Sequence, residues 1–288
     1  MSTEAKVWTV RELLNWSKGW FDERGIDSPR LTGELLLAHV LNVARIRLYV
    51  DIDRPLDKTE LSRYRELVQR RAKGEPTQYL IGTQEFYGRS FKVDRRALIP
   101  RPETELVAER ALRSVGKTDS VRIADIGCGT GALGLTIAAE RPTARVVRTD
   151  LSTDAVALAR ENAAQLKVSD RVEIREGDLT APLGNEVFDV IVTNLPYVAN
   201  GDREKLAIHI RDHEPATALF SGEDGLDHYR RFVPAVAKHI RPGGLLVMEH
   251  GEDQGAQTPA LFDPTLWEKP VVESDLAGLP RFTWAVRR

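Results

Sequence analysis

The sequence has one cysteine and no long apolar run. Cys128 is the only cysteine among 288 residues, so no intramolecular disulfide can form, and no group of cysteine and histidine has the spacing of a structural zinc site. No window approaches the roughly 18 consecutive apolar residues of a membrane span. The segment Met1–Arg11 has no apolar stretch after its charged residues, unlike a secretory signal. We therefore expect a cytoplasmic chain in a reducing compartment, with no membrane segment and no metal site.

The sequence also lacks an excess of charge of either sign. Its 41 Lys and Arg nearly balance 43 Asp and Glu, so no global field would draw the chain to nucleic acid or to anionic lipid. The basic residues from Arg63 to Lys73 are interleaved with Glu60 and Glu66, a pattern typical of a solvated helix face. We expect no stable nucleic-acid binding, because that binding requires many Lys and Arg side chains to neutralise phosphates.

The apolar residues that are present indicate more than one domain. At roughly 150 residues per domain, a chain of this length corresponds to about two. From Thr9 to about Lys73 the apolar residues recur at helical spacing, and Thr9 is followed by Glu12 as in a capping box. We predict a helical domain over residues 1–73 that serves to dock the substrate.

The rest of the chain has a different pattern. Strand-like pieces at Tyr79–Ile81 and Glu85–Val93 predict a linking β-hairpin over residues 74–100. From residue 101 to 288, strand patterns alternate with helix patterns. The predicted strands are Val121–Ile126, Arg145–Thr149, Val172–Glu176, Phe188–Thr193, Leu245–Glu249 and Phe282–Val286, with helices from about Ala132, over Thr153–Leu166 and near Tyr229–His239. This alternation is typical of an α/β fold with a doubly wound, mostly parallel, Rossmann-like sheet.

A glycine-rich loop follows the first of these strands. The run Asp125-Ile126-Gly127-Cys128-Gly129-Thr130-Gly131 ends a strand and opens a helix, and its glycines let a ligand approach the backbone. The next strand ends at Asp150, where a carboxylate can accept both hydroxyls of a ribose. Asp150 could instead cap the following helix, a role for which Ser152 competes. Asp178 could reach an adenine edge. The loop fits S-adenosylmethionine (SAM), but its first two glycines with Ala132 also satisfy the NAD pattern G-x-G-x-x-A, so the residues alone leave both cofactors open.

The tetrapeptide Asn194-Leu195-Pro196-Tyr197 follows the fourth predicted strand, at the same edge of the sheet as the glycine loop. The Asn194 side-chain oxygen can accept one hydrogen of a planar NH2 group, and the Leu195 carbonyl can accept the other. Tyr197 offers a flat face, and Pro196 stiffens the turn. Two acceptors would orient the nitrogen and stabilise the charge that develops as an electrophilic methyl arrives, without a strong base. The tetrapeptide therefore indicates methyl transfer to a planar nitrogen.

This tetrapeptide resembles the Asn-Pro-Pro-Tyr of methyltransferases that modify adenine, guanine or glutamine, and the blocks around it are more specific. From about residue 74 to residue 255 they resemble, in order, the release-factor glutamine methyltransferase family (PrmC/HemK). The blocks are Gly74-Glu75-Pro76, Gln78–Gly82, Glu85–Gly88, Leu98–Val107, His213-Glu214-Pro215, Ala218-Leu219, Gly222, Asp224–Leu226 and Tyr229. The helical amino-terminal region resembles the family in size and position only.

The resemblance implies transfer of a methyl group from SAM to the N5 side-chain amide of the glutamine in the Gly-Gly-Gln motif of peptide-chain release factors. The implied SAM contacts are Gly127, Cys128, Gly129, Thr130, Gly131, Asp150, Leu179 and Asn194. The implied catalytic and glutamine-binding residues are Asn194, Leu195, Pro196 and Tyr197, with Arg101, Pro102 and Thr104 at the wall of the cleft. Leu195 departs from the proline usual in the family, and His250 stands where an apolar residue is expected.

Two other interpretations of the sequence stay open. A methyltransferase could use the same tetrapeptide on another planar nitrogen, in a ribosomal-protein glutamine or in adenine or guanine of nucleic acid, although the near-neutral charge disfavours a duplex substrate. A non-catalytic scaffold could retain the fold, but the complete glycine loop with Asp150 and Asn194 argues against it. Measuring SAM binding would separate a scaffold from an enzyme.

Overall fold

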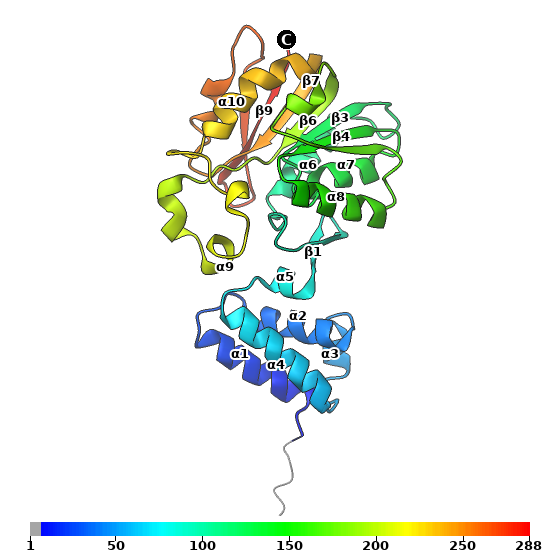
Figure 1. Cartoon of the computed structure of the whole chain (residues 1–288), viewed down its shortest axis with the longest axis vertical. Helices are drawn as coiled ribbons and strands as arrows, with labels where there is room; N and C mark the ends of the chain where they lie inside the picture. Colours follow the sequence, from blue (N-terminus) through cyan, green and yellow to red (C-terminus); the bar gives the residue numbers. More distant parts are fainter. Residues whose placement is uncertain (1–6) are drawn as a thin grey trace, which may run out of the picture. The chain divides into compact units, whose positions relative to one another are not determined.

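The computed structural model describes residues 7–288 (Figure 1), and the part of Met1–Arg11 before Val7 lies outside the described residues. Contacts divide the chain into two units. The first runs to Gly82 and also includes Ile208–His213, and the second comprises Thr83–Ala207 and Glu214–Arg288. The bounds drawn from the sequence, 1–73, 74–100 and 101–288, place the first division nine residues earlier than Gly82, and they do not anticipate the return at Ile208.

The first unit is a small helical bundle, as apolar spacing predicts. Its helices are α1 (Val10–Asp22), α2 (Pro29–Leu41), α3 (Arg47–Val50), α4 (Lys58–Ala72), α5 (Thr77–Ile81) and α9 (Ile208–Arg211). The capping box predicted at Thr9 and Glu12 starts α1, and a second one at Asp57 and Glu60 starts α4. Phe21, Leu36 and Tyr64 are among the buried side chains of its core.

The prediction of a strand at Tyr79–Ile81 is wrong, because these residues belong to helix α5. Pro76 precedes the helix with a fixed φ of −58°, and Gly82 ends it in the left-handed region at φ +76°. Leu80 is buried in the core of the helical unit. A short apolar run fits a helix or a strand equally well, and here the flanking proline and glycine favour the helix.

The predicted hairpin is present, begins at Thr83 rather than at Glu85, and belongs to the second unit. Strands β1 (Thr83–Phe86) and β2 (Arg89–Lys92) pair antiparallel across Tyr87 and Gly88. Both turn residues have positive φ, +50° and +68°, as a two-residue type I′ turn requires. The Phe86 and Phe91 rings meet edge to face with their centroids 6.1 Å apart.

The second unit is built on a seven-stranded sheet in the order β5-β4-β3-β6-β7-β9-β8. The strands are β3 (Arg122–Ile126), β4 (Arg145–Asp150), β5 (Val172–Glu176), β6 (Phe188–Thr193), β7 (Ile240–Glu249), β8 (Val271–Ser274) and β9 (Pro280–Val286). The strands from β5 to β7 in this order are parallel to one another, and β9 pairs antiparallel with β7 on one side and with β8 on the other. The predicted doubly wound, mostly parallel sheet is therefore confirmed.

Helices cover both faces of the sheet (Figure 1). Helices α6 (Thr104–Arg113), α7 (Ala132–Glu140) and α8 (Thr153–Gln165) lie on one face, and α10 (Asp227–Val236) lies on the other. Alternate residues of β7 serve the two faces: Leu245 and Val247 pack with α6 and α7, whereas Leu246 and Met248 pack with α10. Short 3-10 helices span Ala181–Leu183, Asn200–Lys205, Ala216–Ala218, Ala237–His239 and Thr258–Leu261. Within residues 7–288, no helix is long and apolar enough to cross a membrane.

The strand order places a binding crevice at the carboxyl end of β3. After β3 the chain continues to β4 and β5 on one side, and then returns to β6 on the other side. Such a reversal opens a crevice at the carboxyl ends of the strands. Gly127, Asp150 and Asn194 follow or end β3, β4 and β6 there.

Candidate active site

A cavity of about 370 Å³ opens at this edge of the second unit. Its size falls within the roughly 300–1,000 Å³ of ordinary ligand pockets. The predicted site residues that line it are Arg101, Thr104, Gly127, Cys128, Gly129, Thr130, Asp150, Leu179, Asn194, Leu195 and Pro196. Pro102, Gly131 and Tyr197, which were also predicted, are not among the lining residues. Most of the predicted site residues therefore share one cavity, whose other lining residues include Ala97, Leu133 and His228.

The glycine loop needs glycine for two different physical reasons. Gly127, Gly129 and Gly131 all have left-handed φ, of +70°, +52° and +99°, which strains any residue that carries a Cβ. At Gly131 space is also missing, because a Cβ there would lie 2.5 Å from Nη1 of Arg148. At Gly129 a Cβ would meet no atom closer than 3.9 Å, so the backbone conformation alone selects glycine there.

A buried ion pair between Arg148 and Asp125 holds the glycine loop in place. Arg148 on β4 lies 3.0 Å from the Asp125 carboxylate, and neither side chain is more than 1% exposed. Arg148 also donates to the main-chain carbonyl of Cys128 at 3.1 Å, and Asp125 accepts from the Gly134 N–H at 2.9 Å. Two buried charges thus hold the main chain on both sides of the loop, which preorganises it.

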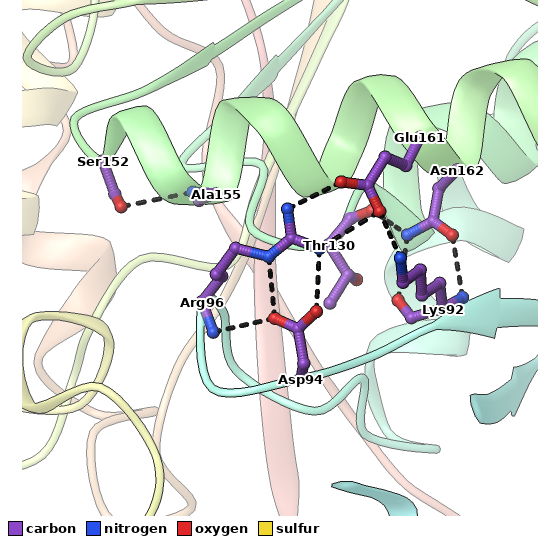
Figure 2. Close-up of polar contacts among 8 residues, drawn as sticks. All are labelled: Lys92, Asp94, Arg96, Thr130, Ser152, Ala155, Glu161 and Asn162. Carbon is purple, nitrogen blue, oxygen red and sulfur yellow. Dashed lines mark hydrogen bonds and ion pairs between the residues drawn. The ribbon is translucent and has the colours of Figure 1, made fainter. Parts of the chain in front are cut away.

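A second support, which the sequence reasoning missed, is Asn162 on α8 (Figure 2). The Asn162 side-chain oxygen accepts from the Lys92 N–H at 2.7 Å, and its nitrogen donates to the carbonyls of Lys92 at 3.0 Å and Thr130 at 2.8 Å. One carboxamide therefore joins the end of hairpin strand β2 to the glycine loop. Around it, Arg96 pairs with Asp94 and Glu161 (Figure 2). The available signal was a polar residue among the apolar positions of a helix.

Asp150 faces the cavity with part of its hydrogen-bonding capacity unused. Its two oxygens accept from the main-chain N–H groups of Gly129 at 2.8 Å and Ser152 at 2.9 Å. A carboxylate has about four acceptor positions, so about two remain for a ligand. The alternative role, capping the next helix, is taken by Ser152, whose hydroxyl accepts from Ala155 N–H at 3.2 Å.

The loop after β5 contributes to the same cavity. Asp178 and Leu179 both line it, and Leu179 has a left-handed φ of +48°. The Leu179 carbonyl accepts from the Thr149 hydroxyl at 2.9 Å, and Asp178 forms an ion pair with Arg231. His228, which the sequence reasoning also missed, lines the cavity with a ring nitrogen 2.7 Å from the Ser221 hydroxyl. Burial lowers the pKa of His228.

The tetrapeptide is held by side chains from three other elements. The Asn194 carboxamide nitrogen donates to the Thr104 hydroxyl at 3.1 Å, and the Leu195 N–H donates to the Tyr229 hydroxyl at 3.3 Å. The Tyr197 hydroxyl donates to Glu249 at 3.2 Å. Within the described residues, Oδ1 of Asn194 makes no hydrogen bond. The unused acceptor is thus one of the two oxygens that the sequence analysis assigned to the substrate, the other being the Leu195 carbonyl.

Two further residues of the cavity wall, Arg101 and Cys128, have structural rather than chemical roles. Arg101 is anchored by the buried Glu214, whose other oxygen accepts from the Ile99 N–H, so this pair fastens the segment that forms the cavity wall. Burial raises the pKa of the Cys128 thiol to about 12. Cys128 therefore stays protonated at neutral pH and does not act as a thiolate nucleophile.

Family comparisons agree with this arrangement. The PrmC N-terminal domain family matches residues 12–82, and the methyltransferase small domain family matches residues 107–222. Among solved structures, the T. thermophilus 16S rRNA N2 methyltransferase RsmC, in complex with AdoMet and guanosine, is 19% identical with a TM-score of 0.53, and the match covers 72% of this chain and 50% of that one. At that identity the likeness supports the fold alone.

Full-length relatives carry more information. The release factor glutamine methyltransferase of Geobacter sulfurreducens is 42% identical over 98% of both chains. The enzyme of the same name from Nitratidesulfovibrio vulgaris is 38% identical over 97% of this chain and 95% of its own. Because the identity extends through the helical unit as well as the sheet, the chain belongs to the release factor glutamine methyltransferase family.

Proposed function

We propose that this protein transfers a methyl group from SAM to the N5 side-chain amide of a glutamine in the Gly-Gly-Gln motif of peptide-chain release factors. The observation that carries the proposal is the unused Oδ1 of Asn194 in the wall of a cavity that also contains the glycine loop and Asp150. Membership of the family supplies the class of substrate. A substrate from the translation machinery places the enzyme, under this proposal, in the cytoplasm.

The residues present fit SAM. The backbone of the glycine loop borders the cavity at Gly127 and Gly129, and the absence of Cβ atoms lets a ligand approach it closely. Asp150 would accept from the ribose hydroxyls with its unused acceptor positions. Leu179 would pack against the adenine. When bound, SAM supplies an electrophilic methyl group.

The tetrapeptide would orient the glutamine amide without removing a proton from it first. Oδ1 of Asn194 would accept one N–H of the substrate, and the main-chain carbonyl of Leu195 would accept the other. A pair of acceptors fixes the plane of the amide and stabilises the positive charge that grows on nitrogen during transfer. Leucine in place of the usual proline leaves this carbonyl in position. Leu195 is 3% exposed, and its side chain is part of the core that includes residues of α10.

The helical domain, residues 1–73 with the rest of the first unit, would dock the release factor. None of the site residues above belongs to it, and a macromolecular substrate offers surface well beyond one glutamine. Ile46, just before α3, and Val50, its last residue, are 69% and 64% exposed, and exposed apolar side chains that form a patch mark interaction surfaces. We expect Ile46→Glu to raise KM for an intact release factor about tenfold, a loss of about 1.4 kcal/mol in binding. Methylation of a short Gly-Gly-Gln peptide should not change. Equal effects on both substrates would contradict docking at this position.

The function is tested with isotope-labelled SAM. The protein is incubated with purified release factors, ribosomal proteins and nucleic acids, and the label is mapped by mass spectrometry. We expect label on the Gly-Gly-Gln glutamine, labelling slower by about 100-fold or more with Asn194→Ala, and normal labelling with Asn200→Ala, whose side chain is exposed in a nearby 3-10 helix. Label confined to a ribosomal protein or to nucleic acid would instead favour another planar nitrogen. A protein that binds SAM but labels none of these substrates would contradict the proposal.

A further inference from the structure

A buried carboxylate, Glu249, lies behind the tetrapeptide and outside the cavity lining. It is the last residue of β7 and is 2% exposed. Its Oε2 accepts from the Thr104 hydroxyl at 2.6 Å, and its Oε1 accepts from the Tyr197 hydroxyl at 3.2 Å. Both donors adjoin the proposed glutamine site: Tyr197 belongs to the tetrapeptide, and Thr104 is the partner of Asn194.

These hydrogen bonds determine which end of the Asn194 carboxamide faces Thr104. A threonine hydroxyl has one hydrogen to donate. Because Thr104 donates it to Glu249, it can only accept from Asn194, and Nδ2 of Asn194 accordingly lies 3.1 Å from the Thr104 oxygen. A carboxamide with its nitrogen turned to Thr104 has Oδ1 on its other side. An ionised Glu249 thus favours the orientation in which Asn194 presents its acceptor, Oδ1, to the cavity rather than its donor, Nδ2.

We propose that Glu249 is a positioning residue for methyl transfer, which acts through Thr104 to turn the Asn194 oxygen toward the substrate amide and which holds Tyr197 beside it. The proposal rests on the proposed function, because it concerns the same glutamine site. It assigns no contact with substrate to Glu249 itself.

Several charged or titratable groups face Glu249, besides the hydroxyl of Thr104. They are Glu103 at the start of α6, Tyr197, Tyr229 on α10, whose hydroxyl donates to the Glu249 main-chain carbonyl, and Arg281 on β9. Burial is the largest influence and raises the pKa of the Glu249 carboxyl to about 7; the Thr104 and Tyr197 hydrogen bonds and Arg281 lower it, and Glu103 raises it. The carboxyl therefore changes its protonation state near neutral pH.

Protonation would reverse the chain of hydrogen bonds. A carboxylic acid O–H on Glu249 can donate to Thr104, which leaves the Thr104 hydrogen free to donate to Asn194. The carboxamide would then turn its oxygen to Thr104 and its NH2 to the cavity, where it would meet the NH2 of the substrate, donor against donor. One proton is added at Glu249, two hydrogen bonds change direction, and no covalent bond of the protein changes.

The first test requires no substrate. In the 15N-labelled full chain, the side-chain amide signals of Asn194, assigned by their loss in Asn194→Asp, are followed against pH by NMR. We expect them to shift with a midpoint near 7 in the native protein and to stop shifting in Glu249→Gln and in Thr104→Val. Signals that do not move with pH in the native protein, or that still move in both variants, would overturn the proposal.

The second test is the pH profile of single-turnover methyl transfer at saturating SAM. The native rate should rise as Glu249 loses its proton and level off above about pH 8. Thr104→Val should lower the plateau by about 10- to 100-fold, since an unoriented acceptor misplaces the reacting amide, whereas Thr104→Ser, which keeps the hydroxyl, should retain the shape of the profile. Glu249→Gln should flatten it.

The control is Thr136→Val, which changes another buried threonine of the same unit. The Thr136 hydroxyl has no hydrogen-bond partner among the described residues, so we expect the native profile. A Thr104→Val enzyme with native rate and native profile would refute the relay. If the native protein methylates no release factor, the proposed function fails, and the NMR measurement still decides the role of Glu249.

Discussion

Asn162 provides a quantitative test of how the glycine loop is held, because its side chain makes three hydrogen bonds and is 0% exposed. In Asn162→Ala all three are lost, which at about 1 kcal/mol each amounts to about 3 kcal/mol. Water can replace part of the two bonds to the exposed Lys92. The carbonyl of Thr130, a residue only 3% exposed, stays unpaired and by itself costs about 1–3 kcal/mol. We expect a loss of about 2–4 kcal/mol in the free energy of unfolding.

The assay is equilibrium urea denaturation, with SAM affinity measured separately by calorimetry. Because the lost partner is part of the glycine loop, SAM should bind about tenfold more weakly, which is about 1.4 kcal/mol. Gln165→Ala is the matched control on the same helix: its side chain also donates to β2, at 2.8 Å to the Ser90 carbonyl, but it is exposed, so its loss should cost under about 0.5 kcal/mol. If the two variants unfold alike and bind SAM alike, the buried amide does not support the loop and the reasoning is refuted.

Three further predictions address the cofactor, the tetrapeptide and a buried histidine. Asp150→Ala should weaken SAM binding by roughly 10- to 100-fold, from lost bonds to a charged group of about 1.5–3 kcal/mol; unchanged affinity in calorimetry would remove the ribose assignment. Asn194→Ala should lower single-turnover methyl transfer by roughly 10²–10³, whereas Leu195→Ala keeps the carbonyl and should slow it little, although loss of the buried side chain costs about 2–5 kcal/mol of stability. A folded, SAM-binding Leu195→Ala enzyme as slow as Asn194→Ala would contradict the carbonyl role. Burial lowers the pKa of His250, so the contribution of the neutral histidine to the free energy of unfolding is complete above about pH 6.5, its unfolded pKa, and is lost as the pH falls below that value. The melting temperature of His250→Leu should therefore exceed that of the native protein by more at about pH 5 than at about pH 7.5. An equal difference at both pH values would contradict this role of His250.

The sequence predicted well those elements that have a clear residue pattern within a short stretch of the chain. Val172–Glu176 and Phe188–Thr193 are strands at the predicted bounds, because the first alternates apolar with charged residues and the second is rich in the β-branched residues that favour strands. The helix α6, which follows Pro102, and the strand β8 were not predicted. β8 has only four residues, and Glu273 is one of them. Because its pairing partner β9 lies later in the chain, no local sequence pattern indicates this strand.

The candidate site also has a part that the sequence predicts and a part that it does not. The glycine loop and the tetrapeptide are contiguous in sequence, and short motifs of that kind can be identified without a structure. Their supports are not contiguous: Thr104 and Glu249 are 145 residues apart, and Lys92 and Asn162 are 70 apart. A buried polar residue inside an apolar strand or helix was the only available sign of such a support, and its partner could not be named until the fold brought the two together.

The edges of the sheet bear on how the protein behaves at high concentration. An edge strand presents unpaired N–H and C=O groups, to which a strand of another molecule can add. Here the edges are β5 and β8, with five and four residues, and β5 alternates apolar positions with Glu173 and Arg175, which form an ion pair with each other. A second chain that paired there would have to accommodate these charged side chains along its own edge. The enzyme is therefore protected from edge-to-edge aggregation on both sides of its sheet, and variants that replace Glu173 or Arg175 with apolar residues should precipitate at lower concentration than the native chain.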